Sequence, residues 1–263
     1  MKKYFVIGNP IKHSLSPKLH NFWIKKKNIN ATYDKILATQ DDLPKICDQI
    51  REKKINGLNI TVPFKNDIIR NLDELSLEAK ETQSVNTIYF KDNKIIGHNT
   101  DIIGFKFSIE KAQYDVSKKK ILILGAGGVV SSLIYALNKL GASKIIVCNR
   151  TKSKAENLKH LFKEIDIVNW GEVPNFDMII NATSLGLKNE DIIDLDFSKV
   201  GSGKFFYDVI YNPAETNFLK IGKKMGNKAE NGKMMFIYQA SASFELWHGI
   251  KVNIDDETIN QIN

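Results

Sequence analysis

One lysine of this chain stands in a context that suits proton transfer. Lys65 ends the segment spanning residues 59–65, which also contains Pro63. Proline is typical of the first turn of a helix, where the positive end of the helix dipole disfavours an ammonium ion. A lysine placed there gives up its proton more easily and can serve as a general acid or base. Considered alone, Lys65 is still explained better as one more surface lysine.

A pair of serines could hold a carboxylate. Ser14 and Ser16 are two residues apart, so their hydroxyls point the same way if this loop is extended. Two hydroxyl donors on one side suit a carboxylate group. The alternative, which the local sequence favours, is that Ser16 caps the helix that begins at Pro17.

Four further polar residues could bind a ligand. Asn59 and Thr61 share one face at the carboxyl end of an expected strand, which is where α/β proteins bind ligands. Asn86 lies farther along, and Asp101 stands just before an expected helix. Asp101 is explained equally well as a plain N-cap.

A glycine-rich turn suits a dinucleotide. Gly125-Ala126-Gly127-Gly128 follows a strand pattern and precedes a helical one, which is the required context. Glycines let the backbone approach a pyrophosphate, and the helix N-terminus supplies N–H donors. The match is imperfect because Val130 occupies the third position, where Gly or Ala is usual. An ordinary turn between strand and helix remains the alternative.

The end of the next strand favours NADP over NAD. An NAD enzyme typically carries a carboxylate there, which binds the ribose 2′-hydroxyl. This chain has Asn149-Arg150-Thr151 instead, with Lys154 three residues on. A guanidinium and an ammonium suit a 2′-phosphate. The alternative is a surface turn that carries basic residues by chance.

These residues must be positioned by an α/β fold. Short apolar, β-branched runs alternate with helical patterns, which is typical of α/β proteins with parallel sheets. In the first part we expect strands over residues 4–7, 31–37 and 57–60, helices over 16–27 and 39–53, and a hairpin that joins 87–90 to 94–96. The polar stretch 113–119 is expected to end a connector between domains.

A second α/β unit follows this connector. We expect strands over residues 120–124, 144–148, 178–181 and 205–209, and helices over 129–140 and 153–162. Their order is that of a doubly wound sheet. A long helix from residue 233 to about 247 and a short one over 255–261 close the chain.

The charge and composition exclude several classes of protein. A length of 263 residues suits two modest domains, and the net charge of +8 would suit a nucleic-acid binder. However, only three of the 38 basic residues are arginines, which readers of phosphates and base edges favour. The excess is also spread along the chain, so we expect a solvated lysine-rich surface and no nucleic-acid partner.

The cysteines and the hydropathy of the sequence indicate the cellular compartment of the protein. Cys47 and Cys148 form neither a metal-ligand spacing nor a disulfide framework, so we expect no metal and a reducing cytoplasm. Gly8 ends the first apolar run after four residues, which is too short for a signal peptide. No window approaches the about 18 apolar residues of a membrane span, so we expect no membrane partner.

The motifs together resemble one family, the shikimate dehydrogenases. The matching segments of the N-terminal part are Gly8-Asn9-Pro10, Ser14-Leu15-Ser16-Pro17, Asn59-Ile60-Thr61-Val62-Pro63-Phe64-Lys65, Ser84-Val85-Asn86-Thr87 and Asn99-Thr100-Asp101. Those of the rest are Gly125-Ala126-Gly127-Gly128, Asn149-Arg150-Thr151, Asn181-Ala182-Thr183-Ser184, Tyr207-Asp208, Tyr211, Asn231-Gly232, Gln239-Ala240 and Trp247-His248-Gly249. Each segment is weak evidence, but the ordered set covers essentially the whole chain and is highly specific.

The resemblance implies a fold and a reaction. It implies an N-terminal α/β substrate and catalytic domain, residues 1–101 plus 237–263, onto which the C-terminal helices pack back. Residues 102–236 would form a Rossmann-like NADP-binding domain, with the active site in the cleft between the two. The implied activity is the NADPH-dependent, reversible reduction of 3-dehydroshikimate to shikimate, in the pathway to chorismate and aromatic amino acids. The implied enzyme is cytoplasmic and a monomer or homodimer.

The resemblance also assigns residues to roles. Lys65 and Asp101 would form the catalytic pair. The implied shikimate ligands are Ser14, Ser16, Asn59, Thr61, Asn86, Tyr211 and Gln239, with Asp101 beside them. The implied NADP residues are Gly125, Ala126, Gly127, Gly128, Val129, Asn149, Arg150, Thr151 and Lys154, with Val209, Gly232 and Met235 near the nicotinamide. Lys154 departs from the arginine that the family often has there, and a lysine is a weaker phosphate clamp.

Three other functions remain as alternatives. A quinate/shikimate dehydrogenase of broader specificity is the nearest, but paired serines and Arg150 favour the narrower enzyme. A non-catalytic NADP-sensing protein on the same fold is disfavoured because Lys65 and Asp101 are both present. A nucleic-acid binder is suggested by net charge alone.

Overall fold

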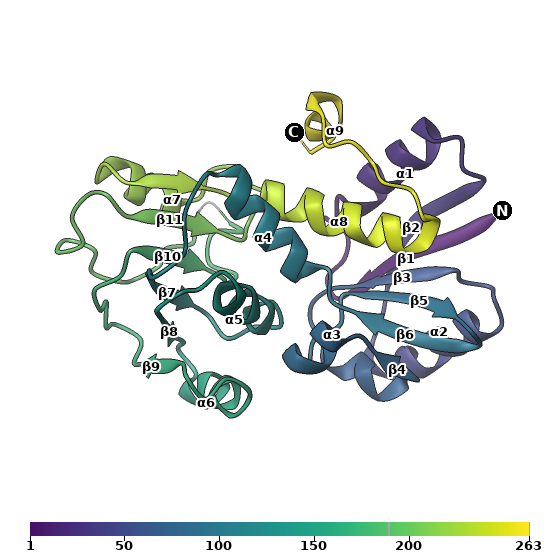
Figure 1. Ribbon diagram of the computed structural model, residues 1–263, viewed down its shortest axis with the longest axis horizontal. Coiled ribbons are helices and arrows are strands. Elements are labelled where there is room, and N and C mark those ends of the chain that lie inside the picture. The colour runs from purple at the N-terminus through teal and green to yellow at the C-terminus, as the bar shows by residue number, and fades with distance from the viewer. Residues whose placement is uncertain (189, 263) are drawn as a thin grey trace. The chain divides into compact units, whose positions relative to one another are not determined.

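The computed structural model describes residues 1–188 and 190–262, which form two compact units (Figure 1). The N-terminal unit comprises Met1–Gly104 and the segment from Ile237 onward, and the central unit comprises Phe105–Phe236. Both divisions fall inside helices, α4 (Asp101–Lys111) and α8 (Lys233–His248). Residues 189 and 263 lie outside the described residues. Residue 189 falls within the expected range 102–236, and residue 263 ends the expected range 237–263.

A six-stranded sheet forms the centre of the N-terminal unit. Its strands are β1 (Lys2–Gly8), β2 (Ala31–Leu37), β3 (Gly57–Ile60), β4 (Glu74–Leu75), β5 (Thr87–Lys91) and β6 (Lys94–His98), in the order β2-β1-β3-β5-β6-β4. The hairpin β5–β6 is confirmed, and β5 also runs antiparallel to β3. The sheet is therefore mixed, and the expectation of parallel sheets is wrong for this unit.

Helices cover both faces of this sheet. They are α1 (Ser16–Lys26), α2 (Leu43–Arg51), α3 (Leu77–Thr82), the second part of α8 and α9 (Asp256–Asn260), with 3-10 helices at Gln40–Asp42 and Asp67–Asn71. Successive residues of a strand face opposite sides. Ile7 of β1 packs in the core with α2, whereas the ring of Tyr4 lies 5.0 Å from that of Trp247 in α8. The C-terminal helix thus packs on the N-terminal sheet, as expected.

The central unit is a parallel six-stranded sheet. Its strands are β7 (Lys120–Leu124), β8 (Lys144–Cys148), β9 (Asp166–Val168), β10 (Met178–Asn181), β11 (Phe205–Asp208) and β12 (Lys228–Glu230), in the order β12-β11-β10-β7-β8-β9. Its helices are most of α4, α5 (Val130–Lys139), α6 (Lys152–Leu161) and α7 (Asn217–Lys224). The chain starts at β7, winds outward to β9 and returns to β10, which is the doubly wound order. The predicted fold class is confirmed.

The observed elements differ from the expected ones where tertiary contacts intervene. The helix expected over residues 39–53 is divided into a 3-10 turn, which begins at a capping box of Thr39 and Asp42, and α2. Pro44 stands at the start of α2 and has no N–H to donate back to the preceding turn. The polar stretch 113–119 lies inside the central unit, so it does not end a connector. Short elements such as α3, β4 and β12 were not expected. Within the described ranges, no helix combines the length and apolar character needed to cross a bilayer.

The core of the N-terminal unit contains a histidine without polar partners. His20 of α1 is 1 % exposed and stacks on Tyr33 at 4.2 Å, and neither of its ring nitrogens has a hydrogen-bond partner among the described residues. Burial, with a smaller contribution from His248, lowers the pKa of His20 from 6.5 to about 3. The folded chain therefore holds His20 neutral over a pH range in which the unfolded chain protonates it.

We expect His20 to make the fold acid-sensitive. Its folded pKa lies below its unfolded value, so its contribution to stability falls as pH drops from 6.5 toward 3. His20→Phe should raise the melting temperature relative to wild type by more at about pH 5 than at about pH 7.5. The matched control is His160→Phe, because His160 is exposed. An equal difference at both pH values would contradict this prediction.

Candidate active site

Lys65 forms a buried ion pair with Asp101. Its Nζ lies 2.5 Å from Asp101 Oδ2, and the two residues are 9 % and 5 % exposed. Among the ion pairs of the described residues, this one alone has both partners buried. Removing water strengthens the attraction between opposite charges. The reading of Lys65 as a surface lysine is therefore wrong.

The local structure around Lys65 differs from the expected α-helix start. Residues 62–66 form a turn, which continues into the 3-10 helix at Asp67–Asn71. The chain leaves helical geometry there because the backbone N–H of Asp73 donates to Ile95 O of β6. The neighbouring sheet thus leaves room for little more than one helical turn.

Asp101 is the first residue of α4 and does not cap it. Its backbone N–H donates to Asn99 Oδ1 at 3.1 Å. Its Oδ2 faces Lys65, and its Oδ1 accepts from Asn86 Nδ2 at 2.9 Å. Both carboxylate oxygens therefore face polar groups of the candidate site, and the interpretation of Asp101 as a plain N-cap is wrong.

Ser14 and Thr61 lie on two loops that are joined by a backbone contact, and Ser16 begins the helix after the first loop. Asn9 N donates to Val62 O at 2.9 Å, which ties the loop after β1 to the loop after β3. Ser16 is the first residue of α1, whereas the N-cap position belongs to Leu15, so the capping interpretation is wrong. Ser14 Oγ accepts from Ser16 N at 3.3 Å, which leaves the Ser14 proton available for a ligand.

Asn86 and Gln239 extend the polar surface beside the ion pair. Asn86 Nδ2 lies 3.3 Å from Gln239 Oε1, so α8 brings its glutamine to the start of α4. Asn59 lies behind Asn86, because its Nδ2 donates to Asn86 O at 3.1 Å. The structure thus brings together Lys65, Asp101, Asn86 and Gln239. Tyr211 belongs to the central unit, where its ring stacks on Phe236 at 4.4 Å.

The glycine turn after β7 has the shape that a pyrophosphate site needs. Gly125 has a φ of +111°, and a Cβ there would lie 2.8 Å from Ala182 O, so the turn requires glycine. A Cβ on Gly127 would meet nothing within 4 Å. The chain's own packing therefore leaves the space over Gly127 open. The N-cap residue of α5 is Val129, whose side chain makes no cap hydrogen bond, and Val130 is fully buried in the core.

The basic residues after β8 are exposed at the neighbouring strand end. Asn149 Nδ2 donates to Thr151 O and thereby shapes this turn. Arg150 and Lys154 are exposed, and no side-chain partner is found for either in residues 1–188 and 190–262. No carboxylate stands in this turn. These residues fit an anionic 2′-phosphate better than a ribose hydroxyl.

Val209 and Gly232 meet at the end of β11. A Cβ on Gly232 would lie 2.1 Å from Val209 O, so only glycine permits this approach. Gly232 N donates to Ile210 O at 3.0 Å, and Met235 is buried in the first turn of α8. Two separate segments of the central unit are therefore held together at this point.

Asp208 is a buried carboxylate to which the sequence analysis gave no role. It accepts hydrogen bonds from Thr216 Oγ1 at 2.6 Å, from Ile210 N and from Asn181 Nδ2. Burial raises its pKa from 3.8 to about 6, and these three bonds oppose the rise. The Tyr207-Asp208 motif was the signal in the sequence, but only the structure shows what the carboxylate contacts.

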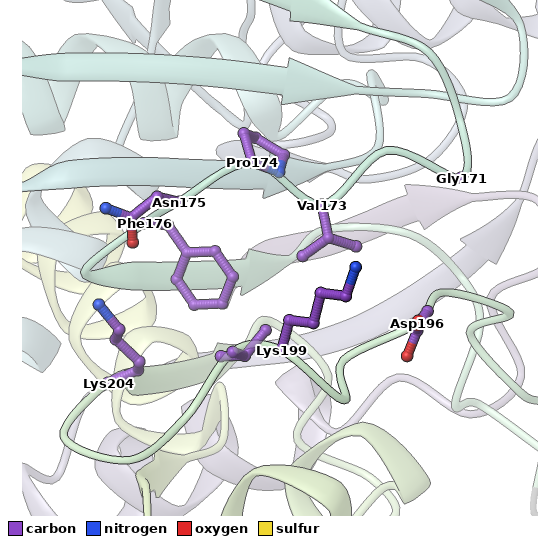
Figure 2. A pocket seen from close by; sticks show the side chains of 9 residues that line it. Gly171, Val173, Pro174, Asn175, Phe176, Asp196, Lys199 and Lys204 are labelled. Atoms are coloured by element: carbon purple, nitrogen blue, oxygen red, sulfur yellow. The ribbon is translucent and has the colours of Figure 1, made fainter.

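A hollow of about 420 Å³ in the central unit lies away from these residues. Figure 2 shows its lining, with Phe176 and Lys199 among the labelled side chains. Its residues precede β10 and β11, whereas the glycine turn follows β7. In a parallel sheet, the segments before the strands lie at the amino ends and the segments after them at the carboxyl ends. The hollow and the glycine turn are therefore at opposite ends of the strands, so the hollow is not the cofactor site. Within the described residues, no cluster of His, Cys, Asp and Glu could hold a metal ion.

Comparisons with known proteins agree with this geometry. Residues 6–88 match the family model of the shikimate dehydrogenase substrate binding domain, and residues 108–208 match that of shikimate / quinate 5-dehydrogenase. A shikimate dehydrogenase (NADP(+)) of Pelagibacter ubique is 62% identical over 264 residues, which cover 100% of both chains. The chain belongs to the shikimate dehydrogenase family. The predicted resemblance is confirmed.

Solved structures of the family share the fold over the whole chain. Shikimate dehydrogenase from Aquifex aeolicus has a TM-score of 0.92 at 38% identity, covering 100% of this chain and 97% of that one. The Thermus thermophilus enzyme, solved in complex with NADP(H) and shikimate, has a TM-score of 0.90 at 28% identity, covering 100% and 98%. Fold and family are therefore established by sequence and by structure.

Proposed function

We propose that this protein catalyses the reversible, NADPH-dependent reduction of 3-dehydroshikimate to shikimate. The observation that carries the proposal is the buried Lys65–Asp101 pair, framed by Asn86 and Gln239, in a chain of this family. NADPH, when bound, supplies the hydride that reduces the ring carbonyl. The work of the protein is then to bind the ring, hold its orientation and deliver a proton.

Lys65 is the group that delivers this proton. Negative charge grows on the carbonyl oxygen as the carbon is reduced, and an ammonium can stabilise it and donate a proton. Asp101 holds the lysine through a 2.5 Å contact, which fixes the direction of Nζ. In the oxidative direction the same lysine, in its neutral form, accepts the proton of the hydroxyl.

The remaining polar residues orient the ring. Ser14 and Ser16 hold the carboxylate, and Thr61, Asn86, Tyr211 and Gln239 face the ring hydroxyls. Thr61 lies close to the start of the loop that carries Ser14. Gly8 is the residue before that loop, and a Cβ on Gly8 would lie 2.5 Å from Thr61 Cγ2. These assignments place a carboxylate at one end of the substrate and the reacting oxygen near Lys65.

The cofactor is NADP, bound by the central unit. The N-terminus of α5, whose N-cap residue Val129 makes no side-chain cap bond, and the open space over Gly127 suit a pyrophosphate. Arg150 with Lys154 suits the 2′-phosphate. Ala126, Gly128, Val129, Asn149 and Thr151 shape the same two turns. Val209, Gly232 and Met235 form the surface that approaches the nicotinamide.

One assay separates this function from its rivals. The purified protein should oxidise shikimate with NADP, and much more slowly with quinate or with NAD. Comparable rates with quinate would instead indicate a quinate/shikimate dehydrogenase of broader specificity. NADP binding without turnover would indicate a cofactor-sensing protein.

We place the enzyme in the cytoplasm, because Cys47 and Cys148 are free and buried, as expected in a reducing compartment. We also propose that the enzyme is a monomer or a homodimer.

We expect the two serines to anchor the substrate carboxylate. Ser14→Ala and Ser16→Ala each remove a charge-assisted hydrogen bond worth roughly 1.5–3 kcal/mol. Each variant should lose about tenfold or more in kcat/KM for shikimate.

The methyl ester of shikimate, which lacks the charge, provides the matched comparison. The variants should differ much less from wild type on this substrate. A lower melting temperature with unchanged kinetics would show that the serines serve only the fold.

A further inference from the structure

A cluster of buried hydroxyl and amide groups lies behind the Lys65–Asp101 pair, within the N-terminal unit. Its members are Asn59 of β3, Thr87 of β5, Thr100 at the start of α4 and Ser243 of α8, and none is more than 7 % exposed. We call these four residues the hydroxyl cluster. It joins elements that are far apart in the sequence.

Ser243 is the centre of this cluster. Its Oγ lies 2.7 Å from Thr87 Oγ1, 3.1 Å from Thr100 Oγ1 and 3.0 Å from Asn59 Nδ2. Ser243 Oγ also lies 3.1 Å from the carbonyl oxygen of Gln239, so its single proton can go to that oxygen or to Thr87 Oγ1. When Thr87 Oγ1 donates to Asn86 Oδ1, Ser243 is the donor of the 2.7 Å bond to Thr87. The hydroxyl of one residue in α8 thus contacts strand β3, strand β5 and the start of helix α4.

The cluster determines which way the Asn86 side chain points. Asn86 Oδ1 accepts from the backbone N–H of Thr100 at 2.7 Å and from Thr87 Oγ1 at 3.0 Å. A backbone N–H can only donate, so the amide oxygen must face Thr100. The amino group therefore faces Asp101 Oδ1, which it contacts at 2.9 Å.

Asn59 is oriented by the same reasoning. Its Nδ2 donates to the backbone oxygen of Asn86 at 3.1 Å, which accepts only, so its Oδ1 faces Tyr33. The Tyr33 hydroxyl donates to that oxygen at 2.6 Å. Both polar atoms of Asn59 are thus engaged by protein groups.

Stability alone does not require hydroxyls at these positions. An apolar side chain of similar shape can replace a hydrogen-bonded pair at little cost, whereas a partly satisfied buried network is costly. The cluster is fully hydrogen-bonded, and its chain of contacts ends at the carboxylate that holds Lys65. A polar network in this place specifies one arrangement of Asn86 and Asp101.

We infer that Thr87 and Ser243 are positioning residues for the proposed reaction, and that Asn59 acts with them and not as a ligand of shikimate. They hold the Asn86 amino group against Asp101 Oδ1, and this fixes the carboxylate whose other oxygen pairs with Lys65. The inference rests on the proposed function, because its consequence is a rate.

The test compares shape with hydrogen bonding at position 87. Thr87→Val keeps the volume and loses the hydroxyl, whereas Thr87→Ser keeps the hydroxyl and loses a methyl group. Thr87→Val should lower kcat for shikimate oxidation about 10- to 100-fold, because the carboxylate is no longer held in place. KM for shikimate and the dissociation constant of NADP should change by less than about threefold. Thr87→Ser should recover most of the lost kcat.

Ser243→Ala provides a second test, and Ser108→Ala is its matched control. Ser108 is a buried serine of the central unit, where its hydroxyl contacts Tyr207 at 2.8 Å. Ser243→Ala should lose kcat by a similar factor, whereas Ser108→Ala should lower only the melting temperature. If Thr87→Val does not fold, Ser243→Ala with this control carries the test.

Two results would overturn the inference. One is a wild-type kcat in Thr87→Val or Ser243→Ala, and the other is a loss in Thr87→Ser as large as that in Thr87→Val. Failure of the proposed function is a separate result, because the wild-type protein itself would then not oxidise shikimate with NADP.

Discussion

Lys65→Ala should lower kcat by about 10²–10⁴-fold, the usual effect of losing a general acid or base. Lys65 is the lysine buried against Asp101 at 2.5 Å, and no other ion pair in the described residues has two buried partners. NADP binding should persist, because the residues assigned to it lie in the central unit. The measurement is kcat for shikimate oxidation together with NADP affinity by titration.

Lys65→Arg tests whether the proton or only the charge matters. Arginine keeps the positive charge but does not release its proton near neutral pH. We therefore expect no rescue in this variant. Recovery of most of the rate would show that Lys65 is an electrostatic anchor only, and a nearly silent Lys65→Ala would remove the catalytic assignment. A surface substitution such as Lys118→Ala serves as control.

Arg150→Ala should raise KM for NADP by about 10- to 100-fold, the range expected for a lost hydrogen bond to a phosphate. The Arg150 side chain is exposed in the turn after β8, where no carboxylate offers a site for a ribose hydroxyl. KM for NAD should change little, because NAD has no 2′-phosphate. Steady-state kinetics with both cofactors measure the change in preference.

Lys154→Ala and Lys152→Ala refine this prediction. Lys154 should contribute less than Arg150, since an ammonium cannot bind a phosphate in two directions at once. Lys152, which like Lys154 lies in the first turn of α6 and is exposed, is the matched control for general loss of charge. Equal losses with NADP and NAD in Arg150→Ala would mean that Arg150 is structural and that the preference arises elsewhere.

The sequence alone determined the family, the two-unit α/β architecture and the main strands. β2, β3, β7, β8 and β10 begin and end at the expected residues. β7, β8 and β10 are buried, nearly continuous apolar runs bounded by turn residues, whereas β2 is an edge strand recognisable from its β-branched and aromatic residues. The cofactor turns were also predictable, since a glycine turn after a strand and the residue at the next strand end are local features. Resemblance added the site residues, whose individual patterns were weak.

Only the tertiary structure decided what surrounds Lys65, Asp101 and Ser16. Each had a local explanation, as a surface lysine, an N-cap and a helix cap, and each of these explanations proved wrong. The evidence against them is long-range: Asp101 is 36 positions from Lys65 in the sequence. Local sequence reports backbone preferences, but it does not report which distant group lies opposite a side chain.

The hydroxyl cluster shows the same limit most clearly. Ser243 and Asn59 are separated by 184 positions in the sequence. No periodicity or motif around Ser243 predicts that its hydroxyl is hydrogen-bonded to distant residues. Its partners follow from the packing of α8 on β3 and β5, which depends on the whole core of the N-terminal unit. Likewise, Gly232 was expected near the nicotinamide, but only the backbone of Val209 shows why it must be glycine. Local propensity thus determines which elements form, and their packing determines which polar groups meet.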